Sequence, residues 1–190
     1  MSMKPIILIG RSSSGKDTVM AEFIKLGYTR LRTCSTRPGA AKDDYIALTD
    51  EEFEAKKKAG EFAETAEYLQ PDGVFYKYGS LKSSYVNSDE KRIIILNPVG
   101  AWKLLEQKLD YVLVFLDVSP EECLRRAVAR GRQDAVHIAR RTLQDAQDFE
   151  NFEENFKPDI IVRGIVEPER IAKEVDDYMF RGCTGKKIII

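Results

Sequence analysis

The feature that most restricts the fold is a glycine-rich turn near the start of the chain. The apolar run "PIILIG" (5–10) has the length and composition of a buried strand. After the turn, Val19, Phe23 and Ile24 follow at helical spacing. Such a turn between a buried strand and a helix directs backbone N–H groups and the positive end of the helix dipole at one point. The sequence therefore predicts an anion-binding loop at the carboxyl end of a buried strand.

The turn itself, "GRSSSGKDT", matches the phosphate-loop pattern G-x-x-x-x-G-K-S/T except at its last position. Lys16 is expected to reach the outer phosphates of ATP. The expected ATP-binding residues are Gly10, Arg11, Ser12, Ser13, Ser14, Gly15, Lys16, Asp17 and Thr18.

Asp17 stands where the pattern has a hydroxyl residue. A carboxylate is a hard oxygen ligand, so we expect Mg²⁺ to bind at Asp17 and Thr18. Without metal, the charge of Asp17 would repel the phosphates, which predicts Mg²⁺-dependent binding. The alternative is that Asp17 only favours the first helical turn through the helix dipole.

Composition narrows the class of protein. The 190 residues suit one domain with a full hydrophobic core, and 30 basic against 31 acidic side chains disfavour nucleic-acid binding. No apolar stretch has the length of a membrane span. The three cysteines, Cys34, Cys123 and Cys183, lack metal-ligand spacing and indicate reduced thiols in a cytoplasmic protein.

Strand and helix signals alternate along the chain, which predicts an α/β fold: a mainly parallel sheet flanked by helices. Further buried strands are expected in 92–96, 111–118 and 159–162, and a shorter or edge strand in 29–33. Capping boxes are expected at Ser119 with Glu122 and at Thr49 with Glu52, where Gly60 ends the helix. The C-terminal "CTGKKIII" fits an edge strand, a packing tail or an interface equally well.

Two segments interrupt this alternation. Residues 33–85 hold a charged helix and two β-like runs, which suggests a small insertion on the rim of the core. Residues 130–141, "RGRQDAVHIARR", are rich in arginine and poor in apolar side chains. We expect both segments to cover a site, leaving a core made of 1–32, 86–129 and 142–190.

Six stretches in order now resemble the guanylate kinase family over nearly the whole chain. They are "GRSSSGKDT", "STRPG", "DDYIALTDEEFEAKKKAGEFAETAEY", "YKYGS", "SPEECLRRAVARGR" and "IARRTLQDA". The resemblance implies a P-loop NTPase-type fold in one domain, with a nucleoside-monophosphate-binding insertion at 33–85 and an arginine-bearing lid at 130–141. It also implies phosphoryl transfer from ATP to a nucleoside monophosphate, with GMP or dGMP as the expected acceptor.

The resemblance also assigns residues to the acceptor. A glutamate, Glu64, would accept hydrogen bonds from guanine N1–H and the 2-amino group. Thr33 and Ser80 would add small hydroxyls to the same pocket. The acceptor phosphate is assigned to Arg37, Tyr45 and Tyr78, whose guanidinium fork and phenol hydroxyls are suitable donors.

In the lid, the resemblance assigns Arg130 and Arg141 to the transferring phosphates. Together with Lys16 and Arg37 they form the expected catalytic set, because phosphoryl transfer needs positive charge on a loose transition state. Arg132 and Arg140 are secondary candidates, and His137 is interpreted as a surface residue of the lid.

Three positions depart from the family pattern. The second phosphate-binding arginine that usually follows Arg37 is missing, with Lys42 as a substitute, and Asn97 replaces an acidic residue in the acceptor pocket. Asp17 is the third. In these three positions the chain resembles the ribose 1,5-bisphosphate phosphokinases. The alternative activity is therefore the production of phosphoribosyl pyrophosphate.

A non-catalytic guanylate-kinase-like binding module is a further alternative, which the retained Lys16, Arg130 and Arg141 disfavour. The expected partners are ATP and a nucleoside monophosphate, without nucleic acid or membrane, and a homodimer is left open.

Overall fold

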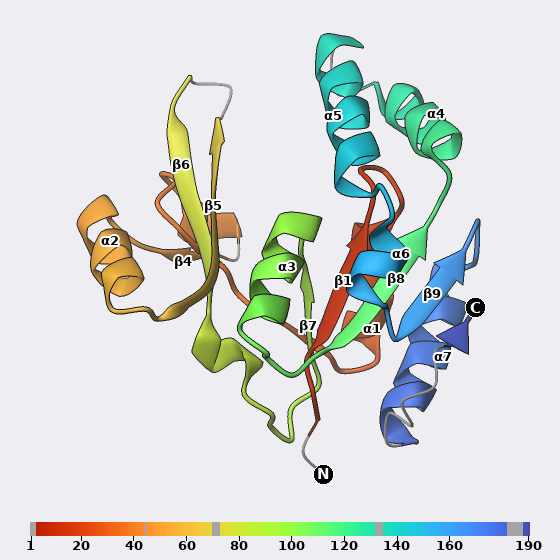
Figure 1. Ribbon diagram of the computed structural model, residues 1–190, viewed down its shortest axis with the longest axis horizontal. Coiled ribbons are helices and arrows are strands. Elements are labelled where there is room, and N and C mark those ends of the chain that lie inside the picture. Colours follow the sequence, from red (N-terminus) through yellow and green to blue (C-terminus); the bar gives the residue numbers. More distant parts are fainter. Residues whose placement is uncertain (1–2, 44, 70–72, 132–134, 182–187) are drawn as a thin grey trace.

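The computed structural model describes residues 3–43, 45–69, 73–131, 135–181 and 188–190. It contains a larger sheet covered by helices and a smaller sheet beside it, with two further helices above the larger sheet (Figure 1).

The larger sheet has six strands in the order β10-β9-β8-β1-β7-β2, and all neighbouring strands are parallel. Its strands are β1 (Ile6–Gly10), β2 (Thr29–Arg30), β7 (Arg92–Ile95), β8 (Val112–Asp117), β9 (Ile160–Arg163) and β10 (Ile188–Ile189). The four predicted buried strands are confirmed. The predicted strand at 29–33 is reduced to two residues at one edge, and the end of the C-terminal segment forms the opposite edge.

Helices cover both faces of this sheet, which confirms the α/β fold. Helices α1 (Lys16–Lys25) and α7 (Pro168–Phe180) pack on one face, and α3 (Pro98–Glu106) and α6 (Phe152–Phe156) on the other. Side chains of β1 alternate between the two faces: Ile6 and Leu8 join the first cluster, Ile7 and Ile9 the second. Burying each such side chain stabilises the fold by about 1.5–3 kcal/mol.

The helix predicted from Val19, Phe23 and Ile24 is confirmed, but its apolar residues are buried unequally. Val19 and Phe23 of α1 are buried as expected, but Ile24 is 45% exposed and Met20 takes its place in the core. Ile24 lies next to Phe23 on the helix, and only a narrow stripe of α1 faces the sheet.

The smaller sheet has the order β4-β3-β6-β5, and its strands lie between residues 34 and 81. Its elements are β3 (Cys34–Ser35), η1 (Ala40–Asp43), β4 (Ile46–Ala47), α2 (Asp50–Lys58), β5 (Phe62–Leu69), β6 (Phe75–Leu81) and η2 (Lys82–Tyr85). Cys34, Phe53 and Phe62 form a separate small core under this sheet. This unit therefore has its own apolar packing beside the larger sheet.

The two predicted capping boxes have different outcomes. At α2, Glu52 N–H donates to Thr49 Oγ1 (3.1 Å) and Thr49 N–H to Glu52 Oε2 (2.8 Å), so this box is confirmed. Gly60 follows the last turn with φ +71°, as expected for a helix end.

At α4 (Pro120–Arg130) the predicted box is only half formed. Glu122 N–H donates to Ser119 Oγ (3.3 Å), but the Glu122 carboxylate binds Arg125 and Arg126 instead of the cap N–H. Two guanidinium groups one turn along offer charge-assisted hydrogen bonds, which are stronger than a bond to one backbone N–H.

Helix α5 (Ala135–Asp148) packs against α4, and the pair lies over the carboxyl ends of β1 and β8 (Figure 1). Most of the arginine-rich segment is therefore helical, and Ile138 is the buried residue of α5. Among the described residues, no helix combines the length and apolarity that a membrane crossing requires.

Candidate active site

The glycine-rich turn joins β1 to α1 in the conformation that the sequence predicts. A Cβ at Gly10 would lie 2.9 Å from the Leu116 carbonyl oxygen, so only glycine fits against β8. Gly15 has φ +102° and directly precedes α1, while Ser13 also has a positive φ of 63°. These turns direct the loop amides to the carboxyl end of the sheet.

Lys16 folds back over the loop. Its Nζ donates to the carbonyl oxygens of Gly10 (2.7 Å) and Arg11 (2.7 Å). Burial lowers the pKa of Lys16, while the charge of Asp145 raises it in part. The loop backbone thus holds the Lys16 ammonium beside the loop. From there the side chain could turn to bind a phosphate.

Two side chains of α5 bind Ser12 in the middle of the loop. Ser12 N–H donates to Asp145 Oδ2 (2.7 Å), and Ser12 Oγ accepts from Arg141 Nε (3.1 Å) and Nη2 (3.0 Å). Asp145 was not among the expected site residues, because it lies beyond the predicted lid. Its spacing of four residues after Arg141, which puts both on one helix face, is the signal that could have found it.

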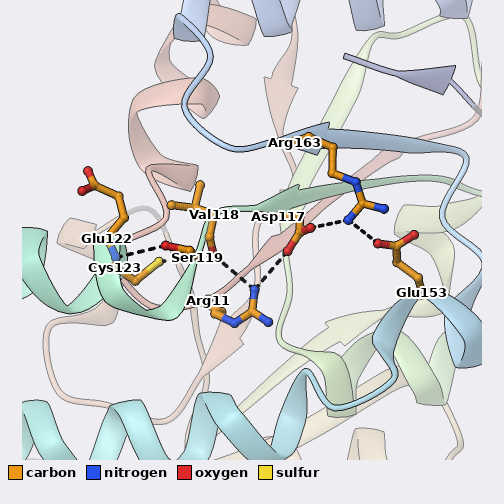
Figure 2. Close-up of polar contacts among 8 residues, drawn as sticks. All are labelled: Arg11, Asp117, Val118, Ser119, Glu122, Cys123, Glu153 and Arg163. Carbon is orange, nitrogen blue, oxygen red and sulfur yellow. Dashed lines mark hydrogen bonds and ion pairs between the residues drawn. The ribbon is translucent and has the colours of Figure 1, made fainter.

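Arg11 anchors the loop to β8 (Figure 2). Its Nη1 donates to Asp117 Oδ1 (3.2 Å) and to the Val118 carbonyl oxygen (3.1 Å), and its guanidinium lies 5.3 Å from the Phe149 ring centroid. Asp117 also pairs with Arg163, which in turn pairs with Glu153. The charge of Arg11 is therefore directed to this network, although the side chain still borders the cavity.

A cavity of about 480 Å³ lies between the loop and helices α4 and α5. We call it the donor cavity. It brings together the expected Lys16, Asp17, Arg130 and Arg141, and Asp145 also lines it. His137 is exposed, as expected for a lid residue, and borders the same cavity.

Other expected residues lie elsewhere. Thr18 lines a separate cavity with Ser14, Gly15 and Arg126, on the side of the loop that faces α7. Arg140 is exposed and is not among the residues that line the donor cavity. Arg132 and Cys183 lie outside the described residues, and the side chain of Lys42 is not described.

A second cavity of about 410 Å³, here the acceptor cavity, lies between the smaller sheet and the carboxyl ends of β2 and β7. Arg30 and Tyr68 also line it and were missed. Arg30 lies outside the six stretches that carry the resemblance, and Tyr68 ends one of them but was given no role. The cavity brings together six of the seven expected acceptor residues: Thr33, Arg37, Tyr45, Glu64, Tyr78 and Asn97.

Glu64 is a buried carboxylate in the wall of this cavity. It is 8% exposed, and its Oε1 accepts a hydrogen bond from Ser80 N–H (2.9 Å). Burial raises the pKa of Glu64. Ser80, the seventh expected residue, lies behind Glu64, where its hydroxyl binds the Tyr85 hydroxyl (2.8 Å).

Asn97 both caps a helix and faces the acceptor cavity. Its Oδ1 accepts from Gly100 N–H (2.7 Å) at the start of α3, and its Nδ2 donates to the Tyr68 hydroxyl (2.7 Å). Because a neutral amide can accept and donate at once, Asn97 links α3 to the strand that carries Glu64. An acidic side chain has no N–H to donate to Tyr68.

Comparison with known proteins gives the family. No family model matches the chain. A guanylate kinase from Symbiobacterium thermophilum is 32% identical over 147 residues, which are 72% of this chain and 67% of that protein. A bifunctional ribose 1,5-bisphosphokinase–thymidine phosphorylase from Cupriavidus necator is 29% identical over 140 residues, 70% of this chain and 22% of that protein.

A crystal structure of guanylate kinase from Anaplasma phagocytophilum has the same fold, with a TM-score of 0.59 and 19% identity over 97% of this chain and 89% of that one. The glycine-rich loop, Arg130, Arg141 and the acceptor cavity lie in one molecule with that fold, and the sequence relatives span 72% of the chain. The chain therefore belongs to the guanylate kinase family of nucleoside monophosphate kinases.

Proposed function

We propose that the protein transfers the γ-phosphoryl group of ATP to GMP or dGMP. The observation that carries this proposal is the buried carboxylate of Glu64 in the acceptor cavity. An ionised carboxylate only accepts hydrogen bonds, and guanine offers two adjacent donors, N1–H and the 2-amino group. Adenine has an unprotonated N1 and no 2-amino group, so it leaves the buried carboxylate unpaired, at a cost in binding.

Three other residues of this cavity suit the acceptor phosphate. Arg37 supplies a guanidinium fork, and Tyr45 and Tyr78 supply phenol hydroxyls. The two tyrosine rings pack edge to face with centroids 5.7 Å apart, which restricts where their hydroxyls point. Base and phosphate contacts thus lie in one cavity, as a mononucleotide requires.

The donor cavity suits the transferring phosphates. Lys16, Arg130 and Arg141 all line it, and phosphoryl transfer requires positioning and charge neutralisation more than a general base. On this assignment residues 33–85 bind the acceptor, residues 130–141 act as the lid, and the remainder forms the core of one domain. Lys42 stays the proposed substitute for the second phosphate-binding arginine that the family pattern has after Arg37.

The donor set of this cavity fits Mg²⁺. The Asp17 carboxylate and the Ser12 and Ser13 hydroxyls border it beside Lys16, and Mg²⁺ prefers oxygen ligands. Asp17 would hold the ion, which would neutralise charge on the nucleotide phosphates. Thr18 lies at the separate cavity and is the weaker metal candidate.

An acceptor screen tests the proposal. ADP release is measured by a coupled assay with Mg²⁺–ATP and GMP, dGMP, AMP, CMP, UMP or ribose 1,5-bisphosphate. We expect turnover with GMP and dGMP, far above that with the other nucleotides. Turnover with ribose 1,5-bisphosphate alone would reject the nucleotide acceptor.

Ribose 1,5-bisphosphate as the acceptor has support of its own. Arg30 gives the acceptor cavity a second guanidinium besides Arg37, which a second phosphate could use, and the relative from Cupriavidus necator is named for a ribose bisphosphokinase. Absence of both turnover and ATP binding by calorimetry would favour a binding module.

A further inference from the structure

The loop amide of Ser12 is already bound to an anion of the protein itself. Amides of such a loop are the groups that hold nucleotide phosphates. Here Ser12 N–H donates to Asp145 Oδ2 at 2.7 Å, and Ser12 Oγ lies 3.4 Å from Asp145 Oδ1. The half-buried Asp145 also lines the donor cavity. A carboxylate therefore occupies a position that a phosphate oxygen would take.

The neighbouring cations are engaged in the same way. Arg141 lies one helical turn before Asp145 on α5 and donates twice to Ser12 Oγ. Lys16 donates to two carbonyl oxygens of the loop. Each of these contacts uses a group that bound phosphates would use, so nucleotide binding must exchange them.

We propose that Asp145 is an internal competitor of the nucleotide phosphates, which must displace its carboxylate from Ser12 N–H. Arg141 and Asp145 share one face of α5, so the displacement of Asp145 and the transfer of Arg141 from Ser12 to the phosphates are one movement of that helix. Asp145 thereby ties the position of the lid to the state of the loop. The inference rests on the proposed function for the identity of the nucleotide, but its chemistry needs only a phosphate at the loop.

Calorimetric titration tests this competition, with ATP and inorganic tripolyphosphate as ligands, each with and without Mg²⁺. Asp145→Ala removes the competitor, and we expect about tenfold tighter binding of both ligands, the effect of exchanging one charge-assisted hydrogen bond. Asp145→Asn should bind with intermediate affinity, because its amide oxygen still accepts from Ser12 N–H but carries no charge.

Asp148→Asn is the matched control. It removes the same charge from α5. The Asp148 carboxylate accepts a hydrogen bond from Gln144 on the same helix. Asp148 does not line the donor cavity, so loss of its charge should change affinity by less than about twofold. An equal gain in Asp148→Asn would mean that long-range charge, not displacement, explains the effect.

Unchanged or weaker binding in Asp145→Ala would overturn the inference, and a loss confined to Mg²⁺–ATP would instead make Asp145 a metal-site residue. If circular dichroism shows that Asp145→Ala does not fold, the comparison of Asp145→Asn with its control Asp148→Asn decides the test. If the protein turns over GMP but Asp145→Ala binds ATP and tripolyphosphate with unchanged affinity, only this inference is rejected. If Asp145→Ala binds tripolyphosphate more tightly but the protein does not turn over GMP, only the proposed acceptor is rejected.

Discussion

In the donor cavity, Lys16, Arg141 and Asp145 bind the loop itself, whereas in the acceptor cavity Glu64 and Asn97 are held by residues outside the cavity lining. Lys16 binds loop carbonyls and Ser12 binds Asp145, so these contacts cover the surface that a ligand would use. Glu64 accepts from Ser80 N–H and Asn97 from Gly100 N–H, and neither Ser80 nor Gly100 is among the residues that line the cavity. From this difference we expect the donor side to rearrange on ligand binding and the acceptor side to need little change.

The largest effect is expected at the donor side, from Lys16→Ala. Loss of this ammonium removes positive charge that stabilises the transferring phosphoryl group, and kcat should fall about a thousandfold. Initial rates of ADP release at saturating ATP and acceptor measure it. Lys25→Ala is the control, because Lys25 lies on the same helix but pairs with Glu22 on the exposed surface. Equal losses in the two variants would remove Lys16 from the catalytic set.

On the acceptor side, Glu64→Gln should change selectivity more than rate. A glutamine offers only one acceptor atom and turns a donor towards guanine, so kcat/KM for GMP should fall about a hundredfold. The ratio of kcat/KM for GMP to that for AMP measures this change. Glu67→Gln, an exposed position on the same strand, should leave the ratio unchanged. An unaltered ratio in Glu64→Gln would show that Glu64 does not read the base.

The acceptor side should also respond to pH through Glu64. Burial raises the pKa of this carboxyl above its ordinary value, so it takes up a proton at a higher pH than an exposed glutamate. The protonated form loses an acceptor, and KM for GMP should therefore rise as pH falls from neutral through that raised pKa. A pH profile of KM measures it. Glu64→Gln should abolish this rise, and a rise that persists in the variant would assign it to another group.

The smallest effect is expected from Asp17→Ser. Without metal, Asp17 adds negative charge beside the phosphates, so the variant should bind metal-free ATP about threefold to tenfold more tightly. With Mg²⁺ this gain should shrink or reverse, because Asp17 is the proposed ligand of the ion. Calorimetry with EDTA and with Mg²⁺ compares the two states. If both states show the same shift, Asp17 acts through the helix or the loop and not through the metal.

Much of this architecture could be predicted because its signals are local. The buried strands of the larger sheet, the turn at Gly10 and the capping box at Thr49 depend on residues close together in the chain. The box predicted at Ser119 is only half formed, because Arg125 and Arg126 compete with the cap N–H for the Glu122 carboxylate.

Long-range partners could not be predicted in the same way. Asp145 binds Ser12 from 133 residues away, and Arg30 enters the acceptor cavity from an edge strand with no motif of its own. The sequence signals used here report local geometry, and these contacts exist only once α5 lies on the loop and the smaller sheet lies beside β2.

The sequence by itself determined the strand–loop–helix unit and the α/β class, because hydrophobic periodicity and glycine positions act over a few residues. It also supplied the candidate phosphate-binding side chains, through its motifs. Only the tertiary structure decided what those side chains bind in the free protein. Arg11 turns to Asp117, Lys16 to the loop carbonyls and Ser12 to Asp145, because unpaired polar and charged groups find partners within reach when the chain packs.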